Sequence, residues 1–466
     1  MSISESPPGH HFDPTILREY DIRGIVGETL HDADATVLGR AYATILRESG
    51  GRSVAVGRDG RLSSPSLETA LVEGLAASGV DVIRIGLGPT PMLYYAGHTL
   101  GVDGALMVTG SHNPPTHNGF KLMLGKRSMF GEDIKQLGVV AASGAFPQGA
   151  GRVSERVVVD DYVARLLEDF RGGRPLRVAW DAGNGATGEV LQQLVAKLPG
   201  THTLLNEAID GRFPAHHPDP TEPENLVQLQ AAVRDGKLDL GIAFDGDGDR
   251  IGVVDGDGKI LWGDQLLCVL AREVVEALPG AQIIADVKAS QVLFDEIGRI
   301  GGTPLMWRTG HSLIKAKMAE TGAPLAGEMS GHIFYADRYY GYDDALYAAI
   351  RLLGVVARGE QSLAAMRARL PAVVNTPEIR IPCPETRKFA VIDEIKARLR
   401  DSGARVSDID GVRVSTPEGW WLVRASNTQA VLVARAEARN AAGLDRLRAQ
   451  LAAQLSSSGV TLPQGH

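Results

Sequence analysis

The chain has 466 residues, of which 44% are hydrophobic and 22% are charged, with a formal net charge of −8. These proportions are typical of a globular protein of about three domains, and the acidic balance gives no sign of a nucleic-acid partner. No apolar run is long enough to span a membrane, and residues 1–8 lack the basic and apolar regions of a secretion leader. Cys268 and Cys383 have no metal-binding spacing, so we expect buried free thiols in a reducing cytoplasm.

Strand-like and helix-like segments alternate along most of the chain, which predicts α/β units. The first such segments are residues 52–57 (strand), 64–77 (helix) and 80–85 (strand). A weak internal repeat accompanies the alternation, in which strands are followed by polar loops. One series lies at residues 54–60, 178–185 and 283–288, and a second at residues 108–115, 244–250 and 326–332. The repeat predicts three α/β domains with these loops at the carboxyl ends of strands, where such sheets bind ligands.

Stretches rich in Gly or Pro indicate where the domains end. They lie at residues 144–151, 255–258 and 370–372. The predicted domains are therefore residues 1–155, 156–258, 259–371 and 372–466. In the last domain, strands are predicted at residues 376–382 and 430–437 and a closing helix at residues 444–455, which indicates a smaller α+β fold. Residues 255–258 also favour a hairpin turn between two short apolar segments.

Ser111 lies in a loop that follows an apolar run over residues 104–108, which predicts a buried strand. Pro114 and Pro115 cannot continue a strand or sit inside a helix, so Ser111 is expected on a tight turn. The loop is no nucleophile elbow, because Asn113 stands where the second Gly is needed, and the chain contains no P-loop signature. A plain loop serine and a phosphorylatable serine both remain open from this motif alone.

A second loop alternates aspartates with glycines directly after an apolar strand at residues 240–243. The aspartates are Asp245, Asp247 and Asp249. Such spacing lets several carboxylates turn toward one hard cation, Mg²⁺ or Ca²⁺. An EF-hand is excluded, because Arg250 and Gly256 occupy the positions that require Gly and Glu. A surface Asp-Gly turn is the alternative.

Other polar residues are weaker candidates. Lys121, His112, His332 and Arg250 could each be ordinary polar residues outside a site. Residues 424–428 could form a bare hairpin, but Arg, Ser, Asn and Thr side chains together with backbone N–H groups offer the donors that a phosphate needs.

Four stretches, in this order along the whole chain, resemble the signatures of the α-D-phosphohexomutase superfamily. They are residues 108–114 (VTGSHNP), 245–250 (DGDGDR), 327–332 (GEMSGH) and 424–428 (RASNT). The most similar branch is bacterial phosphomannomutase/phosphoglucomutase. The phosphoglucosamine mutase branch typically carries Gln where Met329 stands and Ser-Gly-Thr where residues 426–428 stand. The resemblance implies an α/β fold of three similar domains with mixed sheets, plus a smaller α+β C-terminal domain, around a central cleft.

The resemblance also implies roles for individual residues. It implies that Ser111 is a phosphoserine whose phosphoryl oxygen binds Mg²⁺ together with Asp245, Asp247 and Asp249. Catalytic roles fall on Ser111, His112, Lys121, Arg23, Arg250 and His332, with His332 favoured as general acid or base. Contacts to the substrate fall on Tyr20, Arg23, Lys288, His311, Glu328, Ser330 and His332, and the non-reacting phosphate is assigned to Arg424, Ser426, Asn427 and Thr428.

The implied activity is the reversible interconversion of hexose 1-phosphate and hexose 6-phosphate, for mannose and glucose, with Mg²⁺ as cofactor. Glucose 1,6-bisphosphate is the implied activator and bound intermediate. Phosphoglucosamine mutase is the alternative within the family. A metal-dependent sugar phosphatase and a sugar-phosphate sensor are alternatives from other functional classes. The oligomeric state stays open, with a monomer among the options.

Overall fold

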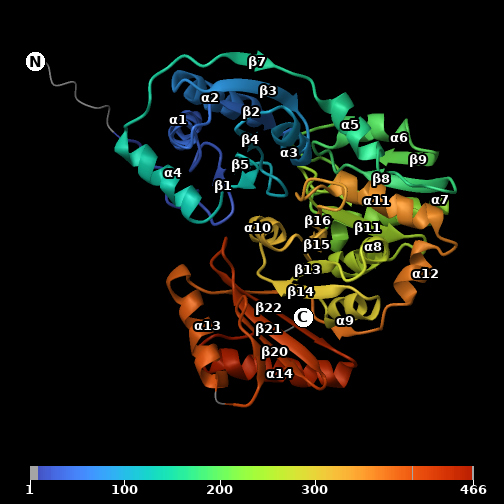
Figure 1. Cartoon of the computed structure of the whole chain (residues 1–466). Helices are drawn as coiled ribbons and strands as arrows, with labels where there is room; N and C mark the ends of the chain where they lie inside the picture. The colour runs from blue at the N-terminus through green and yellow to red at the C-terminus, as the bar shows by residue number, and fades with distance from the viewer. Residues whose placement is uncertain (1–8, 401, 464–466) are drawn as a thin grey trace, which may run out of the picture.

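We analysed a computed structural model of the chain, which describes residues 9–400 and 402–463. The expectation that residues 1–8 hold no leader falls outside these described residues. Four sheets follow one another along the chain in a curve (Figure 1). Among the described helices, none has the length and apolar character needed to cross a bilayer.

The first three sheets are mixed, as expected, because each combines parallel and antiparallel pairs. The first contains β1 (Ile22–Ile25), β2 (Ser53–Arg58), β3 (Asp81–Leu87), β4 (Gly104–Val108), β5 (His117–Leu124), β6 (Arg127–Ser128) and β7 (Val153–Glu155). The second contains β8 (Leu176–Asp181), β9 (Gly200–Leu205), β10 (Leu240–Phe244), β11 (Ile251–Asp255) and β12 (Ile260–Leu261). The third contains β13 (Gln282–Asp286), β14 (Thr303–Trp307), β15 (Leu325–Gly327) and β16 (Ile333–Tyr335).

The predicted internal repeat is confirmed by the strand pairing. In each of these sheets a central strand, β2, β8 or β13, pairs in parallel with one neighbour on each side. The next strands of the repeat, β4, β10 and β15, each pair with an antiparallel partner, β5, β11 or β16. The first predicted loop series follows β2, β8 and β13, and the second follows β4, β10 and β15. They lie at the carboxyl ends of parallel strands, where the strand order places a ligand site.

The fourth sheet is antiparallel throughout and belongs to a smaller α+β unit, as expected. Its strands are β17 (Val374–Asn375), β18 (Ile379–Pro382), β19 (Arg405–Ser407), β20 (Val412–Thr416), β21 (Gly419–Ala425) and β22 (Val431–Ala438). The strand predicted at residues 376–382 is confirmed as β18, although β18 begins only at Ile379 and a separate two-residue strand, β17, precedes it. Pro377 lies between β17 and β18 and has no N–H to donate to β22, which pairs with both strands.

Helices cover the sheets, and their bounds agree closely with the sequence pattern where one was predicted. They are α1 (Asp32–Glu48), α2 (Ser64–Ala77), α3 (Thr90–Thr99), α4 (Glu132–Ser143), α5 (Val159–Leu167), α6 (Gly188–Val195), α7 (Val227–Gly236), α8 (Gly263–Ala277), α9 (Gln291–Arg299), α10 (His311–Thr321), α11 (Ala345–Arg358), α12 (Leu363–Ala368), α13 (Glu385–Arg400) and α14 (Ala441–Ser456), with a 3-10 turn at Pro223–Leu226. The predicted helix at residues 64–77 is α2, and the closing helix at 444–455 lies within α14.

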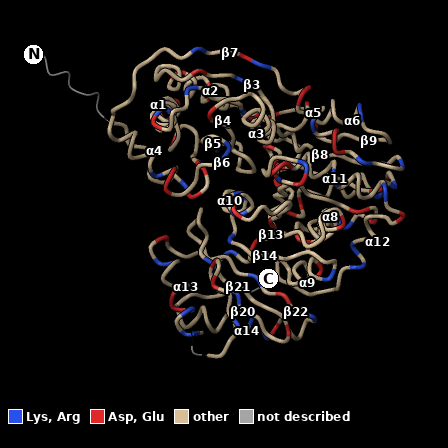
Figure 2. Tube along the Cα trace, viewed as in Figure 1, with Lys and Arg blue, Asp and Glu red and all other residues tan. Residues whose placement is uncertain are grey.

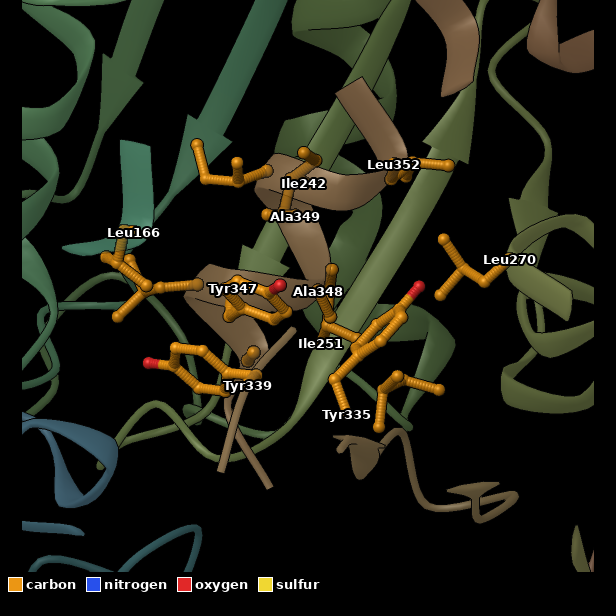
Figure 3. Packing of buried hydrophobic residues seen from close by; sticks show 14 of the residues in the cluster. Leu166, Ile242, Ile251, Leu270, Tyr335, Tyr339, Tyr347, Ala348, Ala349 and Leu352 are labelled. Atoms are coloured by element: carbon orange, nitrogen blue, oxygen red, sulfur yellow. The ribbon is translucent and has the colours of Figure 1, made fainter. Parts of the chain in front are cut away.

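The second and third sheets share one hydrophobic core. Helix α11, which follows the third sheet in sequence, packs against Ile242 of β10 and Ile251 of β11 in the second sheet (Figure 3). Ala348 and Tyr347 of α11 lie in the same cluster and are fully buried. Shared burial of this kind removes a large apolar area from water and holds the two sheets in one arrangement. The predicted domain boundaries themselves stay a prediction.

Lys and Arg are interspersed with Asp and Glu over all four sheets and their helices (Figure 2). Both cysteines are buried and free, as the sequence analysis expected.

Candidate active site

Ser111 lies at the carboxyl end of β4 in a loop that touches the aspartate loop after β10. Its backbone has a φ of +47°, an uncommon conformation for a residue with a side chain. The Ser111 hydroxyl donates to Asp245 Oδ2 at 2.8 Å. The loops approach so closely that a Cβ on Gly246 would lie 2.4 Å from the Ser111 carbonyl oxygen, so only glycine fits there. The strained serine is therefore held against the predicted metal loop.

The aspartate loop is fully buried and organised by backbone and side-chain donors. Asp245 Oδ1 accepts from the N–H groups of Gly248 and Asp249 at 3.0 and 3.1 Å. Lys121 of β5 donates to Asp247 Oδ2 at 2.7 Å and also binds Asp249. Thr90 donates to the same Asp247 oxygen at 2.5 Å.

The donor set of this loop fits a hard divalent cation. Ligand atoms of Asp245, Asp247 and Asp249 lie within 4.8 Å of one another, and all three residues are buried. Asp247 Oδ1 and Asp249 Oδ1 are buried with no hydrogen-bond partner among the described residues. Unpaired buried carboxylate oxygens are costly, and a cation that accepts oxygen ligands would satisfy them.

The three neighbouring carboxylates shift the pKa values of ionisable groups in and beside this loop. Burial, and then the charges of Asp247 and Asp249, raise the pKa of Asp245 well above its ordinary value. Burial alone would lower the pKa of Lys121, but the same two carboxylates outweigh it and raise that pKa well above its ordinary value. Lys121 thus binds two of the three carboxylates, and the three still lie close enough together for one cation to be held by all of them.

His332 connects the aspartate loop to the loop after β15. Its Nε2 lies 3.3 Å from Asp249 Oδ1, and its Nδ1 lies 3.2 Å from Glu328 Oε2 and 3.0 Å from the Ser330 hydroxyl. Burial would lower the pKa of His332, yet Asp249 and Glu328 raise it to about 9. Glu328 Oε1 also accepts from the N–H of Gly310, directly before α10, at 2.7 Å.

The loop between β21 and β22 meets the first domain. The Asn427 amide donates to the Tyr20 hydroxyl at 2.5 Å, and Tyr20 donates to the Thr309 carbonyl at 2.8 Å. Arg424 donates to Asp410 Oδ2 at 2.9 Å, and the same oxygen accepts from the N–H of Thr309 at 3.0 Å. These contacts join segments of the first, third and fourth domains at one place.

Four domain models of the phosphoglucomutase/phosphomannomutase family match the chain. They are α/β/α domain I at residues 14–137, α/β/α domain II at residues 160–258, α/β/α domain III at residues 262–373 and the C-terminal domain at residues 378–454. Phosphomannomutase/phosphoglucomutase of Pseudomonas aeruginosa is 43% identical over 463 residues, covering 99% of each chain. Phosphoglucomutase of Neisseria meningitidis is 42% identical over 447 residues, covering 95% of this chain and 97% of the relative. A crystal structure of a phosphoglucomutase/phosphomannomutase family protein from Burkholderia thailandensis is 44% identical, with a TM-score of 0.92 over 97% of this chain and 100% of that chain.

The chain belongs to the phosphoglucomutase/phosphomannomutase family. Its membership confirms the resemblance inferred from the four sequence stretches and the expected fold class.

The structure brings most residues predicted from the family resemblance into one connected group. Contacts run from Ser111 through Asp245 and its loop to His332 and Glu328, and from there through Gly310 and Thr309 to Tyr20 and the loop after β21. The remaining predicted residues lie beside this path. Two of them contact the serine loop: Arg23 binds the Gly110 carbonyl, and His112 Nδ1 lies 3.2 Å from the Ser111 hydroxyl oxygen.

The other three contact residues elsewhere in the chain. Arg250 Nη1 lies 3.7 Å from Asp219, and Lys288 binds Glu378 at 3.0 Å. The centre of the His311 ring lies 5.9 Å from that of the Tyr20 ring.

Two residues at the first loop series were missed by sequence reasoning, Asp59 within it and Arg61 directly after it. Arg61, with 2% exposure, donates to the backbone carbonyls of Ser111 and Asn113 at 2.7 and 2.5 Å and to those of Pro114 and His117. Asp59 accepts from the Gly110 N–H at 3.0 Å. Through these hydrogen bonds, the two buried charged residues fix the backbone of the serine loop. Their position directly after β2, in the loop series that accompanies the serine loop, was the available signal.

Proposed function

We propose that this chain interconverts hexose 1-phosphate and hexose 6-phosphate, of glucose and of mannose, through a phosphorylated Ser111. The observation that carries the proposal is the 2.8 Å contact between the Ser111 hydroxyl and Asp245 inside a buried carboxylate cluster. One carboxylate would be enough to act as a base for the serine, so a base role does not explain three. Three carboxylates are expected as ligands of a cation that balances the charge of a phosphoryl group.

Phosphoryl transfer is proposed to run in two steps. Phospho-Ser111 gives its phosphoryl group to the free hydroxyl of a bound hexose phosphate, whose proton leaves to a nearby base, and Ser111 is left as an alkoxide that is protonated. The resulting 1,6-bisphosphate turns over in the site. The Ser111 hydroxyl then takes the other phosphoryl group, and the sugar oxygen regains a proton.

Asp245, Asp247 and Asp249 are proposed to hold Mg²⁺, which would stabilise negative charge on the transferring group when bound. Lys121 supplies a fixed positive charge at the same place, and Arg250 and Arg23 flank the serine loop. His332 is the proposed general acid or base, because its ring sits between Asp249 and Glu328. The protein's contribution is mostly positioning and charge, as in other phosphoryl transfers.

The rest of the substrate is proposed to contact two further loops. Glu328 and Ser330 are assigned to the sugar hydroxyls, with Lys288, His311 and Tyr20 nearby. Arg424, Ser426, Asn427 and Thr428 are assigned to the phosphate that does not react. The Tyr20 to Asn427 contact supports this assignment, because it places the loop after β21 against the first domain. Glucose 1,6-bisphosphate is the proposed activator, and the two free cysteines support a cytoplasmic location.

The activity can be tested with glucose 1-phosphate and mannose 1-phosphate, each with Mg²⁺ and a trace of the matching 1,6-bisphosphate. We expect conversion of both to the 6-phosphates. Galactose 1-phosphate is the control substrate, because its inverted C4 hydroxyl leaves a buried partner unpaired and should cost on the order of 10–100-fold in kcat/KM. Release of inorganic phosphate in place of 6-phosphate would indicate a sugar phosphatase, and a strong preference for glucosamine 1-phosphate would indicate the glucosamine branch.

Replacing Arg424 with Ala is expected to raise KM and lower kcat together, by about 10–100-fold in kcat/KM, because a charge-assisted hydrogen bond to the distal phosphate is lost. Steady-state kinetics on glucose 1-phosphate measure both constants. The control is Arg446→Ala in the same domain, an exposed arginine paired with Glu418. Equal kcat/KM for Arg424→Ala and the unmodified enzyme would remove this loop from the substrate site.

A further inference from the structure

A second group of possible metal-ligating atoms lies beside the aspartate loop and includes Asp343, which has no part in the proposed phosphoryl transfer. It comprises Asp249, His332 and Asp343, the last directly before the N-cap of α11. Ligand atoms of these three residues lie within 4.8 Å of one another, and all three residues are buried. His311, at the start of α10, lies beside the group, with its Nδ1 3.6 Å from Asp343 Oδ2.

Several of the converging atoms have no other partner. Asp343 Oδ2, Asp249 Oδ1 and His311 Nδ1 are buried without a hydrogen bond among the described residues. Asp343 and Asp249 are both 0% exposed. The other Asp343 oxygen accepts from Lys315 at 2.9 Å, so the carboxylate is held in place while Oδ2 points into the group. A fully buried carboxylate oxygen without a donor is costly unless a cation or a proton satisfies it.

One pair of ligand atoms in this group has the spacing of a small tetrahedral ion. Zn²⁺ binds His nitrogen and carboxylate oxygen at about 2.0–2.2 Å, which places neighbouring ligand atoms of a tetrahedron about 3.3–3.6 Å apart. Asp249 Oδ1 and His332 Nε2 are 3.3 Å apart, and ligand atoms of all three residues lie within 4.8 Å of one another. An imidazole with two carboxylates suits Zn²⁺ or Co²⁺, whereas Mg²⁺ prefers oxygen ligands alone.

We propose that Asp249, His332 and Asp343 form a second metal site, with His311 beside it, which takes Zn²⁺ or a similar transition-metal ion and is distinct from the Asp245, Asp247 and Asp249 cluster. Asp249 belongs to both groups, so its carboxylate bridges them when both are filled.

The charged groups around the site are compatible with a dication. Lys315 binds Asp343, and Lys121 binds Asp249 Oδ2, the oxygen that does not face His332. Glu328 lies on the far side of His332. The side chains of His311 and His332 are 13% and 6% exposed, so the group is not fully closed to solvent.

Filling this site would block substrate. If the proposed function holds, His311 and His332 contact the sugar, so the bound ion inhibits the mutase competitively with hexose phosphate and Mg²⁺ does not relieve the inhibition. The binding itself does not depend on the proposed function, because it follows from the three ligating side chains alone.

The test measures ion binding directly in the full chain with saturating Mg²⁺ present. Co²⁺ is added first, because tetrahedral Co²⁺ with nitrogen and oxygen ligands absorbs in the visible range, and Zn²⁺ affinity is then measured by displacement of Co²⁺ and by calorimetry. We expect one equivalent of Co²⁺ to bind with a tetrahedral spectrum, and Asp343→Asn to weaken Zn²⁺ binding by at least about 10-fold, the lower bound seen even for loss of an outer-shell partner.

Two variants keep the result interpretable. Asp257→Asn, in the exposed turn between β11 and β12, is the matched control and should bind Zn²⁺ as the unmodified chain does. His332→Ala removes a ligand without touching Lys315, so it replaces Asp343→Asn if that variant melts early. Unchanged Zn²⁺ affinity in the folded ligand variant, or Zn²⁺ binding that saturating Mg²⁺ abolishes, would overturn the second site. If the unmodified chain binds Zn²⁺ as expected but shows no mutase activity, the proposed function is contradicted and the second metal site is still supported.

Discussion

Replacing Ser111 with Ala is expected to lower kcat on glucose 1-phosphate by on the order of 10⁴-fold or more, because no other group can carry the phosphoryl between the two transfers. The free energy of unfolding should change by no more than about 1.5 kcal/mol, since one hydroxyl hydrogen bond to Asp245 is lost and the loop keeps its other contacts. Coupled-assay kinetics and chemical denaturation measure these two quantities.

Ser66→Ala is the matched control for this experiment, because Ser66 is an exposed serine of α2 in the same domain. It should keep full activity. Intact mass after incubation with glucose 1,6-bisphosphate gives an independent readout, with one phosphoryl group on the unmodified chain and on Ser66→Ala and none on Ser111→Ala. A Ser111→Ala protein that turns over at the normal rate would end the phosphoserine mechanism.

Removal of divalent metal is expected to stop turnover, with a loss of at least about 100-fold, since a bound cation typically contributes several kcal/mol to stabilising charge in the transition state. Mg²⁺ should restore activity better than Ca²⁺, because the smaller ion holds stricter octahedral geometry around carboxylate and phosphoryl oxygens. The measurement is initial rate after exhaustive chelation, followed by titration with each ion.

The chelated protein should stay folded, which a thermal melt checks, because the sheets that carry the loops are held by their own apolar cores. Asp247→Asn should show the same loss and respond weakly to added Mg²⁺, whereas the exposed-turn variant Asp257→Asn should respond normally. Full activity of the chelated enzyme would refute the role assigned to the three aspartates.

The local structure of this protein could be predicted from its sequence because the signals are local. Apolar runs such as residues 104–108 and 240–243 bury every side chain, and they became strands β4 and β10 with almost the predicted bounds. Glycine and proline next to these runs end the strands, and so Ser111 and Asp245 appear on loops. The recurrence of strand and polar loop also indicated the repeated α/β units, which the strand pairing confirms.

Which loops meet was decided only by the tertiary structure. No local pattern in the sequence places the Ser111 hydroxyl 2.8 Å from Asp245, or brings Asp343 of the segment before α11 to His311 of α10. Arg61 is the sharpest case, since a charged residue after a strand reads as an exposed one. Arg61 can be buried because the carbonyls of the Ser111 loop, 50 residues later in the chain, accept its hydrogen bonds and compensate for its lost hydration. Such partners are fixed by the packing of sheets, which depends on contacts far apart in sequence.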